Sequence, residues 1–142
     1  MTPSREYQNP SDEQIKNILE KHNKVAIVGL SSDQTRPSHA VARYLKGKRF
    51  KIIPVNPKEM EVLEEKAYPN LSSIPEEVEI VDIFRRPEHV PPIVDEAIKI
   101  GAKVVWMQEG VVNHHAALKA SQKGLTVVMD RCMAKECRKH CD

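Results

Sequence analysis

Five short runs of apolar, mostly β-branched residues recur along the chain, separated by longer segments rich in polar residues. The runs cover residues 25–28, 51–55, 78–84, 104–107 and 125–129. Runs of this length and composition are typical of buried strands, and the segments between most of them are long enough for crossover helices. This alternation predicts an α/β fold, a doubly wound five-stranded parallel sheet with helices on both faces. We expect three layers and the Rossmann-like strand order 3-2-1-4-5.

Helix start and stop signals support this alternation. Ser38 is placed to cap a helix that Gly47 ends. Two further helices are predicted over residues 91–100 and 113–123, each followed by a glycine. Residues 57–75 contain prolines and charges and predict only an irregular helix or turn beside the sheet edge.

The N-terminal part predicts one more helix. Residues 11–14, Ser-Asp-Glu-Gln, have the spacing of a capping box, so we expect a helix over 11–22 that packs on the sheet. Its apolar residues, if exposed, would let two copies of the chain pair. The chain of 142 residues is the size of one domain, which we place at 1–142 with a core over about 23–132 and a polar tail over 133–142.

Charge and composition exclude several classes of partner. The 22 basic and 20 acidic residues nearly cancel, and the aromatic content of 4% leaves few platforms for stacking bases. We therefore expect no nucleic acid partner. No apolar stretch is long enough for a membrane span or a signal peptide, and the three cysteines lie in the last eleven residues. These features predict a cytoplasmic protein without a membrane partner.

Polar or glycine-containing clusters follow each predicted strand. They are Gly29-Leu30-Ser31-Ser32, Asn56-Pro57-Lys58, Arg85-Arg86-Pro87, Gln108-Glu109-Gly110 and Asp130-Arg131-Cys132. The carboxyl ends of parallel strands share one rim, and ligands bind there at the topological switch point, which the expected order places between the first and fourth strands. Because turns are polar by default, part of these residues needs no role beyond turning the chain.

The first cluster indicates an anion site. Gly29 permits a tight turn, and a helix beginning near Ser38 would direct its positive end at a bound phosphate, with Arg36 adding a donor. The three glycines of a dinucleotide fingerprint are absent, and the loop is longer than that fingerprint requires. A purely structural turn is the alternative.

The second cluster separates ligand classes. NAD-binding domains place an acidic residue after the second strand, whereas this chain has Asn56 and Lys58 there. A phosphorylated ribose fits better, as found in coenzyme A or NADP. Glu59 and Glu61 weaken this inference, and a solvated loop lysine is the alternative for Lys58.

Taken together, these motifs resemble the single-domain CoA-binding protein family, which is similar to the CoA-binding domain of the succinyl-CoA synthetase alpha subunit. That domain has an asparagine-proline-lysine turn after its second strand and a glutamate-glycine turn after its fourth. The resemblance covers residues 23–132 and rests on the following motifs: residues 25–29 with Leu30-Ser31, Arg36-Pro37-Ser38, Val55-Asn56-Pro57-Lys58, residues 81–85, Gln108-Glu109-Gly110 and residues 129–132.

The resemblance implies coenzyme A as the ligand and assigns parts of it to five segments. Gly29-Leu30-Ser31 and Ser38 would hold the pyrophosphate, and Arg36 and Pro37 would also contact the cofactor. Asn56-Pro57-Lys58 would lie along the ribose 3′-phosphate and adenine. Phe84-Arg85 would lie against the nucleotide and pantetheine, and Gln108-Glu109-Gly110 would border the pantetheine arm. The synthetase's phosphorylated histidine lies in another domain, for which this chain has no room, so its ligase chemistry does not transfer.

Three functions remain open at this stage. The first is a module that binds free or acylated coenzyme A without catalysis of its own, working with an acyl-CoA enzyme or as a homodimer. The second is an NADP-dependent or acyl-transfer enzyme, for which Cys132, Asp130, His114 and His115 are the candidate groups. The third is an interaction domain that keeps the fold without the ligand.

The C-terminal cysteines support two further hypotheses. Cys132, Cys137, His140 and Cys141 lack the paired spacing of a zinc ribbon, so we expect a solvated C-terminal helix and no metal. Cys132 would lie at the functional rim, where it could form a mixed disulfide with the coenzyme thiol.

Overall fold

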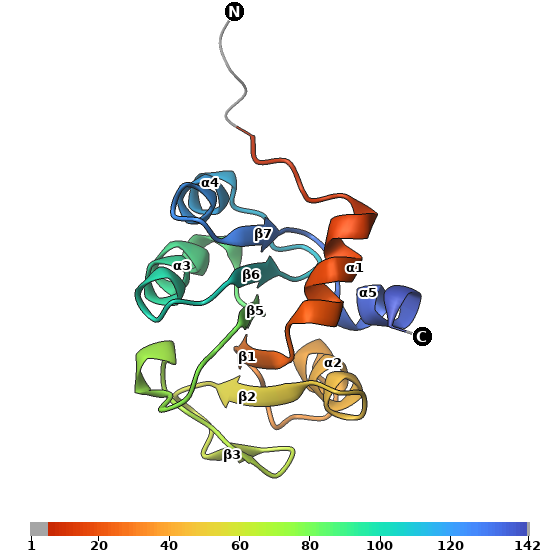
Figure 1. Cartoon of the computed structure of the whole chain (residues 1–142). Helices are drawn as coiled ribbons and strands as arrows, with labels where there is room; N and C mark the ends of the chain where they lie inside the picture. The colour runs from red at the N-terminus through yellow and green to blue at the C-terminus, as the bar shows by residue number, and fades with distance from the viewer. Residues whose placement is uncertain (1–5, 142) are drawn as a thin grey trace, which may run out of the picture.

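The computed structural model describes residues 6–141 and contains the expected alternation of strands and helices (Figure 1). The main sheet consists of β1 (Lys24–Val28), β2 (Lys51–Val55), β5 (Ile80–Ile83), β6 (Val104–Met107) and β7 (Thr126–Val128). The helices are α1 (Asp12–Lys21), α2 (Pro37–Lys46), α3 (Val90–Lys99), α4 (His114–Gln122) and α5 (Met133–His140). All pairings in the main sheet are parallel.

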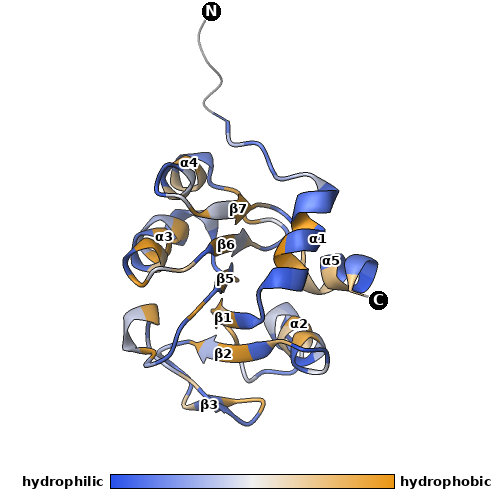
Figure 2. Ribbon diagram, viewed as in Figure 1, coloured by the Kyte–Doolittle hydropathy of each residue, from blue (hydrophilic) through white to orange (hydrophobic). Residues whose placement is uncertain are grey.

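The sheet separates two apolar cores. In Figure 1, α3 and α4 cover one face, and α1, α2 and α5 cover the other. Alternate residues of each strand enter opposite cores: Val28 and Ile83 pack with the first group of helices, whereas Ile27 and Trp106 pack with the second. Figure 2 shows apolar residues on the strands and polar residues on outward helical surfaces. The α/β, doubly wound, three-layer fold class is therefore confirmed.

The predicted strand order is wrong. The observed order is β2-β1-β5-β6-β7, which is 2-1-3-4-5 for the five main strands. Val25 pairs with Ile52 on one side and Ile80 on the other, so β1 lies between β2 and β5.

The physical reason lies in Pro54 of β2. A proline has no N–H to donate, so it is confined to edge strands. The Pro54 carbonyl accepts a hydrogen bond of 3.0 Å from Tyr68 N–H, and Tyr68 also bridges Val55. The outer edge of β2 is therefore covered by the chain at Tyr68, and the next strand pairs on the far side of β1. The switch point lies between β1 and β5.

The connection between β2 and β5 forms no regular α-helix, as expected. It contains a small antiparallel pair, β3 (Glu61–Val62) and β4 (Glu65–Lys66), followed by the 3-10 turn η1 (Leu71–Ser73). A second 3-10 turn, η2 (Pro87–His89), precedes α3.

The terminal helices pack more closely than the sequence indicated. The capping box at Ser11 is present, but Ile15 and Leu19 of α1 are fully buried within the chain, so they offer no surface for a second copy. The C-terminal segment is a packed helix rather than a solvated tail, because Met133 and Cys137 are also fully buried. No helix within residues 6–141 has the length and apolar character needed to cross a bilayer.

A cleft at the carboxyl ends of the strands

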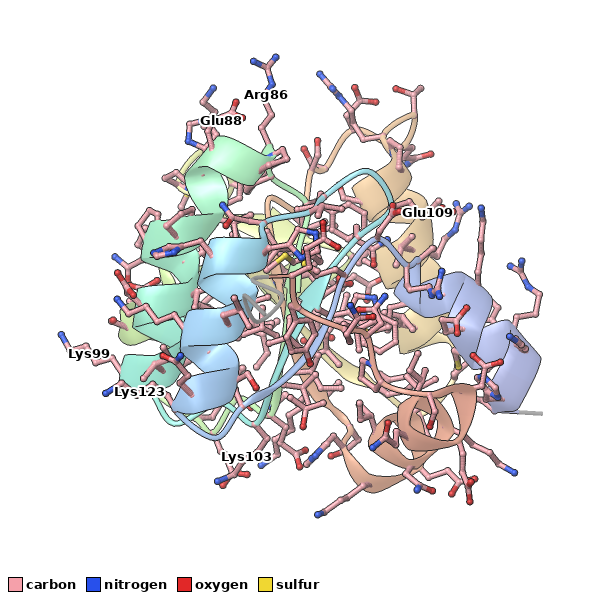
Figure 3. The ribbon with its side chains drawn as sticks, turned by 90° about the horizontal axis from the view of Figure 1, so that it is seen from above. Arg86, Glu88, Lys99, Lys103, Glu109 and Lys123 are labelled. Carbon is pink, nitrogen blue, oxygen red and sulfur yellow. The ribbon has the colours of Figure 1, made fainter. Side chains whose placement is uncertain are left out.

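A cleft of about 1310 Å³ extends across the carboxyl ends of the main strands. Thirteen of the fourteen predicted site residues line it: Gly29, Ser31, Arg36, Pro37, Ser38, Asn56, Pro57, Lys58, Phe84, Arg85, Gln108, Glu109 and Gly110. Figure 3 shows Arg86 near this end of the molecule, and Lys99, Lys103 and Lys123 near the opposite end. The structure thus brings clusters that are distant in sequence to one surface.

Leu30 is the exception. Its side chain is fully buried in the core beneath α1, α2 and α5 and does not line the cleft. Its carbonyl oxygen accepts a hydrogen bond of 3.1 Å from Asn56 Nδ2. Leu30 therefore anchors the loop with its side chain, and the predicted contact of this residue with the pyrophosphate stays a prediction.

The loop after β1 is held against α2 by two hydrogen bonds. Ser31 N–H donates to Ser38 Oγ at 3.2 Å, and His39 Nδ1 contacts the Ser31 carbonyl oxygen at 3.0 Å, an arrangement in which the imidazole donates. The N-cap of α2 is Arg36 rather than Ser38, because Ser38 lies inside the first turn and its hydroxyl binds the loop. Both loop and helix start are thus fixed without a ligand.

The N-terminus of α2 has no side-chain cap. Arg36 makes no capping hydrogen bond, and Pro37 follows at the first helical position. The Arg36 side chain is exposed and lies 3.8 Å from Asp33 Oδ2, a loose surface pair. The start of α2 lines the cleft, and no side chain of the described residues caps it, so the positive end of the helix dipole is suitably arranged for binding an anion.

Asn56 organises the loop after β2. Its Nδ2 donates to Leu30, and its Oδ1 accepts from Lys58 N–H at 3.0 Å. These bonds use the amide within the protein, so Asn56 positions the loop. They leave the Lys58 ammonium exposed at the cleft, and it forms no ion pair within the described part of the chain.

The cleft is basic. Its lining includes four cationic residues, Arg36, Lys58, Arg85 and Arg86, and two acidic residues, Glu96 and Glu109. Glu109 is neutralised by Lys135 at 3.0 Å. Glu96 accepts hydrogen bonds from Leu71 N–H and Ser72 Oγ. The excess of positive charge favours an anionic ligand.

The loop after β6 closes the other end of the cleft. Gly110 has φ +82°, and its N–H donates to Asp130 Oδ1 at 2.8 Å. Gln108 is buried, and its Oε1 accepts from Met133 N–H at 3.1 Å. These contacts join the loop after β6 to Asp130, which follows β7, and to Met133, the first residue of α5. Gln108 therefore supports the cleft wall from its buried side.

Part of the lining was not predicted. Val41 of α2, Pro69 and Asn70 of the β2–β5 connection, and Pro92, Ile93 and Glu96 of α3 also border the cleft. The prediction considered the strand ends and the start of the helix that follows the first strand. Helices on both sides of a switch point also face it, and this topological rule could have indicated the first turns of α3.

The candidate catalytic groups do not assemble. His114 Nδ1 accepts a hydrogen bond from Tyr7 N–H at 3.0 Å, His115 is exposed, and no histidine of residues 6–141 lines the cleft. Asp130 braces Gly110. Cys132 does line the cleft and is 8% exposed.

The fold and the cleft define a Rossmann-like α/β domain with a basic cleft at its switch point. Residues 23–138 match the family described as CoA binding domain. The chain belongs to this family.

Relatives and solved structures agree with this assignment. An uncharacterized protein, YneT, of Bacillus subtilis (strain 168) is 41% identical over 126 residues, which cover 89% of this chain and 93% of YneT. A hypothetical protein from Pyrococcus horikoshii OT3 is 39% identical with a TM-score of 0.92, covering all of both chains. Acetate–CoA ligase [ADP-forming] II of Archaeoglobus fulgidus is 36% identical over 81 residues, covering 56% of this chain but only 12% of the ligase.

Proposed function

We propose that this protein binds coenzyme A, free or acylated, in the cleft at the β1–β5 switch point, without self-contained catalysis. The observation that carries the proposal is the cleft itself: in a chain of the CoA binding domain family, one basic surface collects nearly all the predicted ligand residues.

The size and charge of the cleft support a long anionic ligand. Cavities for ordinary small molecules are about 300–1,000 Å³, so the cleft volume of about 1310 Å³ has room for a nucleotide with an extended arm. Coenzyme A carries a pyrophosphate and a ribose 3′-phosphate. Lys58, Arg85 and Arg86 match those groups in sign, and none of the three forms an ion pair within residues 6–141.

In this proposal the pyrophosphate lies at the loop after β1 and the uncapped start of α2, where Gly29 allows close approach of the backbone. The 3′-phosphate lies near Lys58. The pantetheine arm extends past Phe84 toward Gly110 and Cys132, which lie on the same cleft.

The test is calorimetric titration with coenzyme A, 3′-dephospho-coenzyme A and NADP, using the wild type, Lys58→Ala and Lys99→Ala. Lys99 is an exposed lysine near the opposite end of the molecule and serves as the matched control (Figure 3). We expect Lys58→Ala to weaken coenzyme A binding by about 5- to 30-fold, because a charge-assisted contact to phosphate is lost. Lys99→Ala should bind as the wild type does.

The dephosphorylated ligand isolates the Lys58 contact. The wild type should bind 3′-dephospho-coenzyme A more weakly than coenzyme A, and Lys58→Ala should then have little further effect. No binding of coenzyme A by the folded wild type would overturn the proposal. Binding of NADP alone would instead favour the NADP-dependent enzyme.

A further inference from the structure

We propose that Asp12, Glu136 and His140 form a binding site for a divalent transition metal ion such as Zn²⁺. One ligand atom from each side chain lies within 4.8 Å of those from the other two. The site joins the first turn of α1 to the first and last turns of α5, helices that pack side by side (Figure 1). None of its three residues lines the cleft, so the proposal does not depend on coenzyme A binding.

The helix spacing of α5 directs two of the ligands to one point. Glu136 and His140 are four residues apart and therefore share a helix face. Glu136 Oε1 and His140 Nε2 are 3.8 Å apart, and each side chain is only 12% exposed. Asp12 approaches the same point from the first position of α1.

Two of the ligand atoms are buried without a hydrogen-bond partner. Glu136 Oε1 and His140 Nε2 are inaccessible to solvent and have no hydrogen-bond partner within residues 6–141. They lie 3.8 Å apart and form an ion pair only when His140 is protonated, so a neutral His140 leaves both atoms unsatisfied. Buried polar atoms are nearly always satisfied, so an unsatisfied pair that faces one point needs an explanation. A metal ion would satisfy both, because a carboxylate oxygen and a neutral imidazole nitrogen are each metal ligands.

The separation of the Glu136 and His140 ligand atoms is close to that of two ligands in a metal centre, and Asp12 lies within 4.8 Å of both. Zinc binds nitrogen and carboxylate oxygen at about 2.0–2.2 Å, so two tetrahedral ligands lie about 3.3–3.6 Å apart. The 3.8 Å separation of Glu136 Oε1 and His140 Nε2 needs only a small closure. One imidazole with two carboxylates suits Zn²⁺ and its neighbours in the transition series better than Ca²⁺ or Mg²⁺.

Two neighbouring side chains, Lys139 and Cys141, bear on which atoms can bind the metal ion. Lys139 Nζ lies 3.3 Å from Asp12 Oδ2, an exposed pair that metal binding would have to loosen. Cys141 follows His140, but its thiol interacts with Cys137. We therefore assign the site to two oxygen ligands and one nitrogen ligand, without a thiolate.

The experiment uses the whole chain, stripped of metal with a chelator and kept reduced. Titration with Co²⁺, followed by visible absorption, reports coordination geometry, and titration with Zn²⁺ by calorimetry reports affinity. The variants are His140→Ala and Asp12→Asn, with His115→Ala as the control for an exposed histidine and Cys141→Ser as the control for thiol binding.

We expect one ion per chain in the wild type and at least tenfold weaker Zn²⁺ binding in His140→Ala and Asp12→Asn. Zn²⁺ should raise the unfolding temperature of the wild type and not that of His140→Ala, because the ion joins two helices only in the folded state. His115→Ala and Cys141→Ser should bind as the wild type does. Absence of binding, binding that survives both ligand substitutions, or binding that Cys141→Ser abolishes would overturn the proposal. Asp12 is on the surface, so Asp12→Asn tests the site even where His140→Ala disturbs packing.

Discussion

A β-carbon on Gly29 would lie 2.5 Å from the carbonyl oxygen of Phe84, well inside van der Waals contact. The loops after β1 and β5 are therefore in contact at the switch point. Only glycine, which has no β-carbon, allows the two backbones to approach so closely. Gly29 also has φ +88°, a backbone conformation that side chains disfavour. Its N–H donates to the Val55 carbonyl at 2.8 Å, so one residue links the ends of β1, β2 and β5.

Gly29→Ala should lower the free energy of unfolding by about 2–4 kcal/mol, because left-handed strain and a clash with backbone add together. The matched control is Gly124→Ala: Gly124 has φ +90°, but nothing lies within 4 Å of its added β-carbon. Urea unfolding of Gly124→Ala should show only the strain, about 1–2 kcal/mol. Equal losses in the two variants would contradict the close approach.

The sequence predicted the fold class because each strand and helix has a local signal. Each apolar run, and each glycine that follows a predicted helix, is a signal within a window of about ten residues. Every main strand lies within or across the run that predicted it. Strand order depends on long-range pairing, which such runs do not encode. Pro54 was the overlooked signal, since a proline within a strand argues for an edge position, and the predicted order made that strand internal.

The position of the candidate site could be predicted from the sequence, because it follows from the parallel arrangement of the strands. Parallel strands bring their carboxyl ends together, so five polar clusters had to share a rim whatever the order of the strands. Side-chain direction was harder to predict: Leu30 turns into the core, and Ser38 binds the loop instead of capping α2. The α3 residues were missed because helix packing brings them to the cleft.

Asp82 is a carboxyl group buried in the core, where its charged form is disfavoured. It is fully buried in β5 between Ile27 and Trp106, and its carboxyl oxygens have no hydrogen-bond partner within the described residues. Burial raises the pKa of this carboxyl well above its usual range. The folded protein therefore keeps a proton that the unfolded chain releases near its ordinary pKa of about 3.9.

As the pH rises from about 4, this difference in proton binding lowers the stability of the wild type until the folded carboxyl ionises. Asp82→Asn cannot ionise, so its advantage in unfolding free energy over the wild type should grow with pH across this window. Asp82→Val should add about 1–3 kcal/mol at pH 7, because it also removes an unsatisfied polar group.

Urea unfolding at several pH values between 4 and 7 measures both effects. Asp95→Asn is the control, since Asp95 is exposed and pairs with Lys119 on the surface. Its effect should stay within about 0.5 kcal/mol. A difference between Asp82→Asn and the wild type that does not change with pH would contradict a protonated, buried Asp82.

The three cysteines differ in what they face. Cys132 lines the cleft, whereas Cys137 is fully buried and Cys141 lies beyond it at the end of α5. Burial and the neighbouring Cys141 thiol raise the pKa of Cys137 to about 12, which disfavours its reactive thiolate at neutral pH. Cys132 is therefore the thiol that a ligand in the cleft would meet.

If coenzyme A binds as proposed, its disulfide should modify Cys132 selectively. The Cys132 thiolate attacks one sulfur, a new Cys132–S–S–CoA bond forms, and the second coenzyme A leaves as a thiolate. Intact-mass analysis should show one adduct per wild-type chain and none for Cys132→Ser, with Cys141→Ser as the control that still reacts. Oxidised glutathione at the same concentration should react more slowly, because it lacks the nucleotide that the cleft would hold. An adduct on Cys132→Ser, or equal rates with both disulfides, would show that the cleft does not guide the exchange.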